Sequence, residues 1–117
     1  MSTRTHHVNL PVPDGTAGDV AAFYVDVLGF DIAPRPDSLR PGAWLGVGDG
    51  TQVHLSEGPG APHADQHVAF VVDDFEGVRD RAGAAGAPWT SRGEGRAVFR
   101  DPAGNLVEVF AAGTEPG

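Results

Sequence analysis

The segment His-Val-Asn-Leu-Pro-Val-Pro-Asp at residues 7–14 is echoed by His-Val-Ala-Phe-Val-Val-Asp-Asp at residues 67–74. His, Val, Val and Asp stand at equivalent places in the two segments. A second echo joins Gly-Thr-Gln-Val-His-Leu at residues 50–55 to Gly-Asn-Leu-Val-Glu-Val at residues 104–109. Because the two echoes follow one another in the same order, the sequence predicts two copies of one structural unit.

Each copy begins with a predicted strand and continues with a predicted helix. Apolar and polar residues alternate over residues 7–12, which is the period of a strand. Apolar residues then recur every three or four positions over residues 17–28, which is the period of a helix. Residues 67–72 and 75–85 repeat this pattern in the second copy.

Capping residues mark the ends of both predicted helices. Thr16 and Asp19 have the spacing of a capping box at the start of the first helix. Asp73 or Asp74 is expected to cap the second. Each helix is followed by a glycine suited to a left-handed C-cap, Gly29 and Gly86.

Three short strands complete each copy, near residues 30–33, 43–47 and 52–56 in the first and 88–90, 96–100 and 106–110 in the second. We therefore predict one α+β domain over residues 1–117, with βαβββ modules at 6–57 and 66–112. A module of this size cannot cover its own sheet face, so we expect the two modules to pair. Paired mixed sheets that curl toward one another would enclose a trough.

Charge and composition exclude several classes of function. The 16 acidic and 8 basic residues give a net charge of −8, which repels nucleic acid. The absence of cysteine excludes disulfides and thiolate chemistry, and all basic residues are arginine, which excludes a lysine Schiff base. No apolar run approaches the roughly 18 residues of a membrane span, and the N-terminal sequence is not typical of a signal peptide. We expect a cytoplasmic protein that binds neither nucleic acid nor membranes.

Four side chains that can bind a metal, His7, His54, His67 and Glu108, stand at matched places in the predicted strands. Each points away from its apolar neighbours, because alternate residues of a strand share a face. Taken singly, a strand histidine is more often a structural residue than a ligand, and a glutamate in a last strand is usually solvated. Their placement within the repeat favours a shared metal site. His6 competes with His7 for the first position, and the echo favours His7.

For several other polar and aromatic residues the sequence leaves two possible roles open. Four arginines could face the mouth of the trough or belong to the solvated surface: Arg35, Arg92, Arg96 and Arg100. Trp44 and Trp89 could line the pocket or pack in the core.

Two motifs give the sequence a family resemblance. Phe-Tyr-Val-Asp-Val-Leu-Gly-Phe at residues 23–30 and Asp-Pro-Ala-Gly-Asn-Leu-Val-Glu at residues 101–108, together with the two His-Val strands, resemble the vicinal oxygen chelate superfamily. This superfamily includes glyoxalase I, extradiol dioxygenases, fosfomycin-inactivating thiol transferases and bleomycin-resistance proteins. The resemblance covers about residues 6–110 and implies a glyoxalase-like fold.

The resemblance also implies a ligand set. It places His7, His67 and Glu108 on a divalent metal ion, with His54 at the fourth position. Glyoxalase I has glutamate there, and the thiol transferases have no protein ligand. The metal could be Fe, Mn, Zn, Ni or Co, and no other cofactor is implied. Glu108 or His54, when released from the metal, is the candidate catalytic base.

The function implied is a metal-dependent lyase, isomerase, transferase or dioxygenase that binds a small substrate through two adjacent oxygens. The alternative is a metal-independent protein that sequesters a drug, like the bleomycin-resistance members, and a third possibility is an accessory module with a structural site. The family resemblance further implies a homodimer, in which His7 and His54 of one chain meet His67 and Glu108 of the other. A closed site within one chain is the alternative arrangement.

Overall fold

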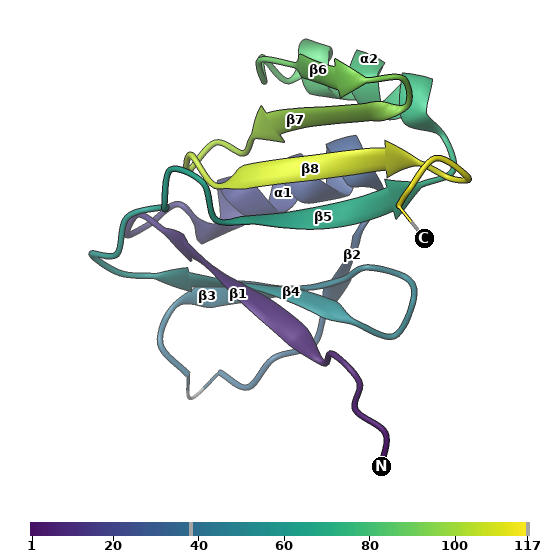
Figure 1. Cartoon of the computed structure of the whole chain (residues 1–117). Helices are drawn as coiled ribbons and strands as arrows, with labels where there is room; N and C mark the ends of the chain where they lie inside the picture. The colour runs from purple at the N-terminus through teal and green to yellow at the C-terminus, as the bar shows by residue number, and fades with distance from the viewer. Residues whose placement is uncertain (38, 117) are drawn as a thin grey trace.

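The computed structural model describes residues 1–37 and 39–116. Its elements run in the order β1 (His7–Val12), α1 (Ala17–Leu28), β2 (Asp31–Ala33), β3 (Gly42–Gly46), β4 (Gln52–Glu57), β5 (His67–Val72), α2 (Phe75–Ala84), β6 (Thr90–Gly93), β7 (Arg96–Arg100) and β8 (Leu106–Ala111). They form two four-stranded mixed sheets, β1-β4-β3-β2 and β5-β8-β7-β6 (Figure 1). The α+β fold predicted from the repeat is confirmed.

The two sheets have matching registers. In the first sheet β1 pairs in parallel with β4, and in the second sheet β5 pairs in parallel with β8. Both β1 and β5 begin with a histidine. Asn9 lies opposite His54 in the first sheet, and Ala69 lies opposite Glu108 in the second. Positions 54 and 108 are therefore structurally equivalent, because the parallel pairing carries the sequence repeat into space.

The start of α1 is stabilised by a residue that local sequence did not indicate. The predicted capping box is wrong, because the hydroxyl of Thr16 donates to the carbonyl of Pro13 and caps no helical N–H. Instead the carboxylate of Glu57 accepts hydrogen bonds from the backbone N–H groups of Gly15 and Ala17, at 2.8 and 3.1 Å. These two hydrogen bonds lower the pKa of Glu57. The last residue of β4 thus fixes the helix that follows β1.

The second module follows its prediction with small shifts. Asp74, one of the two expected caps, accepts a hydrogen bond from the N–H of Gly77 at the start of α2. β6 begins at Thr90, later than expected, and the pairing of β6 with β7 has an irregular register between Ser91 and Gly93. In the described part of the chain, neither helix has the length and apolar character needed to cross a membrane.

Helix α1 joins the two modules. It packs against strands of the first sheet, and Figure 1 shows it passing behind β5 and β8 of the second. The ring of Phe23 contacts the ring of Phe99 in β7 with centroids 6.0 Å apart. The buried hydroxyl of Tyr24 donates a 2.7 Å hydrogen bond to Asp101. The Phe-Tyr motif of the first module therefore packs against the second module.

Asp101 is the centre of a buried hydrogen-bond network. One carboxylate oxygen accepts the backbone N–H groups of Ala103 and Asn105, both at 2.9 Å. The other accepts from Tyr24 and from the side-chain amide of Asn105, which also donates to the carbonyl of Pro11 in β1. The Asp-Pro-x-Gly-Asn motif thus closes the β7–β8 turn and ties it to the first module.

Candidate functional site

The first sheet carries three stacked rings. The ring of His54 lies between those of His7 and Trp44, with centroid distances of 3.9 and 4.3 Å and interplanar angles of 16° and 7°. The register explains the stack, since Trp44 lies directly opposite His54 across β3 and β4. His54 is only 8% exposed as a result. We call this surface of the first sheet, with His7, Trp44 and His54, the histidine face.

His54 is held in a form that can bind a metal or accept a proton. Its Nε2 lies 2.8 Å from the amide oxygen of Gln52, so this nitrogen carries hydrogen and Nδ1 keeps a lone pair. Burial lowers the pKa of His54, and the charges of His7, His6 and Arg35 lower it further. The neutral imidazole is therefore favoured, which is the form that metal ions bind.

The second sheet holds a carboxylate between two basic side chains. Oε2 of Glu108 accepts a 2.8 Å hydrogen bond from Nε of Arg96, and Oε1 lies 3.4 Å from Nε2 of His67. Glu108 is 6% exposed. Nδ1 of His67 lies 2.8 Å from the carbonyl oxygen of Asp65 and so carries hydrogen, which leaves a lone pair on Nε2 of the neutral ring. We call this surface, with His67, Arg96 and Glu108, the glutamate face.

The donor atoms of the glutamate face suit one divalent ion. Two neighbouring ligands bound at about 2.1 Å lie about 3.0 Å apart at an octahedral right angle and about 3.4 Å apart at a tetrahedral angle. The distance between Nε2 of His67 and Oε1 of Glu108 is 3.4 Å. A carbonyl on the other ring nitrogen is also the usual outer partner of a metal-binding histidine. Imidazole and carboxylate donors of this kind fit Fe, Mn, Co, Ni or Zn.

The four predicted ligands fall into two pairs. His7 and His54 meet on the first sheet, and His67 and Glu108 meet on the second. Within residues 1–37 and 39–116, no group of three or more His, Cys, Asp or Glu side chains is placed to hold a metal ion. One chain therefore carries these four side chains as two separate pairs.

The remaining histidines lie outside the two pairs. His6 precedes β1, and its Nδ1 lies 2.8 Å from Nδ1 of His7. His63 lies between the modules, where its Nδ1 accepts hydrogen bonds from the backbone N–H groups of Asp65 and Gln66. His7 therefore has the position in β1 that His67 has in β5, whereas His6 has no equivalent in the second module.

Sequence reasoning missed the partners of the site residues. Gln52 precedes His54 by two positions, and a same-face pair in a strand could have revealed it. Arg96 and Glu108 lie on neighbouring antiparallel strands, and their contact depends on the register set by the turn between β7 and β8. Of the two tryptophans, Trp44 joins the histidine face, whereas Trp89 packs on Phe99 in the core.

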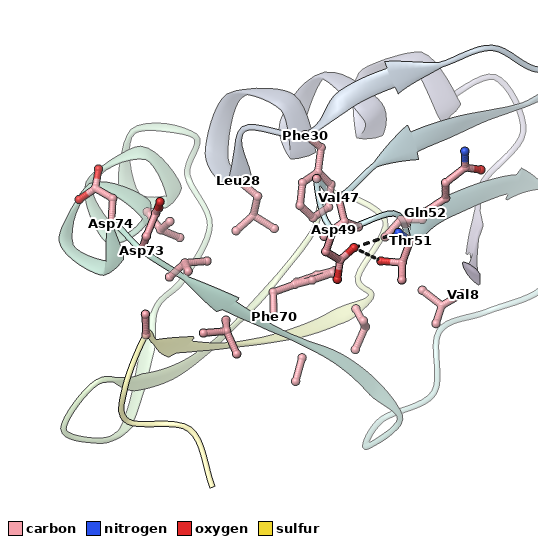
Figure 2. Close-up of a pocket in the computed structure, with 18 of the residues that line it drawn as sticks. Val8, Leu28, Phe30, Val47, Asp49, Thr51, Gln52, Phe70, Asp73 and Asp74 are labelled. Carbon is pink, nitrogen blue, oxygen red and sulfur yellow. Dashed lines mark hydrogen bonds between the residues drawn. The ribbon is translucent and has the colours of Figure 1, made fainter. Parts of the chain in front are cut away.

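A cavity of about 780 Å³ lies in the crease between the modules, away from the four predicted ligands (Figure 2). Its walls are mainly apolar side chains of both modules, including Val8, Leu28, Phe30, Val47, Phe70 and Val78. Three carboxylates, Asp49, Asp73 and Asp74, also line it. Val8 alternates with His7 along β1, so β1 contributes to the cavity from the face opposite the histidine face.

Comparison with known proteins identifies the family. The family model described as a glyoxalase-like domain matches residues 8–110. The chain belongs to this family. The predicted resemblance to the vicinal oxygen chelate superfamily is thereby confirmed. No protein of curated function matches the chain.

Solved structures share the fold. A glyoxalase family protein from Bacillus anthracis has a TM-score of 0.82 at 24% identity, covering 95% of this chain and 96% of that chain. The fosfomycin resistance protein FosX from Listeria monocytogenes, complexed with Mn(II) and 1S,2S-dihydroxypropylphosphonic acid, has a TM-score of 0.75 at 21% identity, covering 95% and 92%. TnmS3, an antibiotic binding protein from a Streptomyces species, has a TM-score of 0.74 at 22% identity, covering 94% and 96%. At these identities the likeness establishes the fold alone.

Proposed function

We propose that the protein is a divalent-metal-dependent enzyme of the vicinal oxygen chelate type, with His7, His54, His67 and Glu108 as its ligands. It binds a small substrate through two adjacent oxygens and acts as a lyase, isomerase, transferase or dioxygenase. The observation that carries the proposal is the geometry of His67 and Glu108: their facing atoms are 3.4 Å apart, and the other ring nitrogen is fixed by the carbonyl of Asp65. The FosX structure with Mn(II) supports a metal in this fold.

A homodimer would complete the site. The two ligand pairs lie on different sheets of one chain, so the histidine face of one chain would meet the glutamate face of another. Strands β1 and β5 stand at the ends of their sheets and pair on one side only within the described chain. This arrangement supplies three imidazoles and one carboxylate to each of two sites.

The residues of the site have distinct chemical roles in this proposal. A divalent ion bound there supplies Lewis-acid stabilisation to an enolate or catecholate substrate. Nδ1 of His54 has a lone pair, because Nε2 donates to Gln52. Both carboxylate oxygens of Glu108 are engaged, one beside His67 and one by Arg96. Of the two candidate bases, His54 is therefore the one whose acceptor atom, when released from the metal, is better placed to take a proton.

Metal binding tests the proposal directly. Protein purified without chelator should contain a stoichiometric divalent metal by elemental analysis, and the metal-free protein should bind Mn(II) in calorimetry. The variants His67→Ala and Glu108→Ala should lose most of this affinity. His63→Ala, which removes an exposed histidine between the modules, should retain it. Metal-free protein whose fold and stability ignore added Mn, Fe, Ni and Zn would refute the proposal.

The crease cavity favours a second candidate, a metal-independent protein that sequesters a drug. Its walls are mainly apolar, and Arg81 in the lining pairs with Asp74 at 3.6 Å, so the carboxylates of Asp49 and Asp73 remain. On a chain of net charge −8 these features suit a large apolar cation. The fold of TnmS3, an antibiotic binding protein, is similar. Tight binding of bleomycin, a cationic glycopeptide, in excess chelator would support this candidate, with Phe70→Asp expected to abolish it. Binding that needs the metal, or no binding, would exclude it.

A further inference from the structure

Arg96 of the glutamate face is anchored at one end and free at the other. Its Nε donates to Oε2 of Glu108 at 2.8 Å, and this is the hydrogen bond that the side chain makes within the described residues. The side chain is 48% exposed, so the terminal guanidinium nitrogens remain open to solvent. An arginine held through Nε keeps its planar fork in one orientation, which lowers the entropy lost when the fork binds an anion.

The sequence repeat does not account for Arg96. Position 96 opens β7 as position 42 opens β3, and Gly42 stands there in the first module. A side chain at Gly42 would collide with the backbone carbonyl of Leu55. Trp44 covers His54 in the first module, whereas Val98 is opposite Glu108 in the second. Arg96 therefore has no counterpart at its own position of the repeat. The cation of the histidine face is Arg35, which comes from the loop between β2 and β3 and lies over Trp44, 5.9 Å from the ring centroid.

One aromatic ring lies beside the guanidinium of Arg96, and an exposed apolar side chain lies on the strand beyond that ring. Phe110 is directly opposite Arg96 in the β7–β8 pair, and the guanidinium carbon lies 5.5 Å from its ring centroid. Val71 is opposite Phe110 in the next strand and is 54% exposed. On the other face of this sheet, the ring of Phe99 in β7 contacts the ring of Phe23 in α1. The glutamate face thus offers a fixed cation next to exposed apolar surface.

We propose that Arg96 selects the substrate by binding a carboxylate, or a similar oxyanion, whose apolar part packs on Phe110 and Val71. This inference rests on the proposed function, because the two chelating oxygens of the substrate would occupy the metal beside Glu108. Arg96 is then a specificity-determining residue, and it also holds the second oxygen of Glu108 away from the metal. The substrate class is an apolar anion with two adjacent oxygens.

A matched pair of probes tests the role of Arg96. 3,4-Dihydroxybenzoate and 3,4-dihydroxybenzamide have the same catechol oxygens and differ in the charge of the group opposite them. Calorimetry on the Mn(II)-loaded protein should give at least about tenfold tighter binding of the benzoate, the effect of one charge-assisted bidentate pair. In ¹H–¹⁵N spectra of a diamagnetic Zn(II)-loaded sample, the benzoate and not the benzamide should shift the Arg96 Nε–H signal.

Variants separate this role from a structural one. Arg96→Met should bind both probes equally at saturating Mn(II), even where its metal affinity also changes, and Arg96→Lys should recover part of the preference. Arg40→Met, which removes an exposed arginine of the loop before β3, should leave the preference unchanged. Equal binding of the two probes by the metal-loaded parent protein, or a preference that survives in Arg96→Met, would overturn the inference while leaving the metal site standing. Absence of Mn(II) binding would overturn the proposed function, and this inference with it.

Discussion

The hydroxyl of Tyr24 offers a clean test of how the two modules are held together. Tyr24 is fully buried and donates to Asp101, which is 4% exposed. Tyr24→Phe removes this donor and keeps the ring that stacks on Phe30. A hydrogen bond to a charged group contributes about 1.5–3 kcal/mol. Asp101 retains the three donors from Ala103 and Asn105, so we expect a loss near the lower end, about 2 kcal/mol.

The same hydroxyl predicts an unusual alkaline unfolding profile. Burial, and then the charge and hydrogen bond of Asp101, raise the pKa of Tyr24 well above its ordinary range. In the unfolded chain the hydroxyl ionises near pH 10, so above this pH the folded state holds one more proton than the unfolded state. Stability should therefore fall by about 1.4 kcal/mol per pH unit above pH 10. The chain has no lysine or cysteine and a single tyrosine, so no other side chain titrates there before arginine.

Thermal unfolding at pH 7 and urea unfolding at alkaline pH, both followed by circular dichroism, measure the two effects. At pH 7 the midpoint temperature of Tyr24→Phe should be about 8 °C lower, at about 4 °C per kcal/mol for a chain of this length. Between pH 10 and 11.5 the parent should lose about 2 kcal/mol, whereas the variant should stay nearly level. A variant as stable as the parent at pH 7, or one with the same alkaline decline, would refute the role assigned to the Tyr24–Asp101 bond.

Two further substitutions test local features of the fold. Glu57→Gln should be less stable than the parent at neutral pH, because the lowered pKa of Glu57 means that its carboxylate stabilises the folded state. The difference in stability should shrink as the pH falls through that pKa. A difference that persists in acid would contradict the capping role. Gly42→Ala should cost about 2 kcal/mol or more by collision with the Leu55 carbonyl, whereas Gly46→Ala, in the same strand with ordinary space, should cost less than about 1 kcal/mol. Equal denaturation midpoints for the two alanine variants would show that the close approach at Gly42 does not matter.

The sequence predicts where the candidate ligands lie within each sheet, but it does not predict whether the two pairs of ligands come together. The repeat and the alternation of side chains along a strand predict equivalent positions for His54 and Glu108. This prediction is confirmed, because these positions depend only on the period of the strand and on the parallel pairing of β1 with β4 and of β5 with β8. Glu57 caps a helix that begins 40 residues earlier in the chain. The local sequence around Thr16 instead predicted a capping box, which does not form. Arg96 reaches Glu108 only through the hairpin register. Whether the two ligand pairs meet depends on how sheets pack, which side-chain periodicity within one strand does not encode.

The shared site is the central claim, and complementation of two variants tests it most directly. His7→Ala and Glu108→Ala each lose one of the four proposed ligands and should bind Mn(II) poorly alone. When the two are unfolded and refolded together, half of the dimers should be mixed, and each mixed dimer should regain one intact site. Electron paramagnetic resonance should then count tight Mn(II) sites at about a quarter of the parent number. A mixture that binds no more Mn(II) than its two components would contradict a site built from two chains.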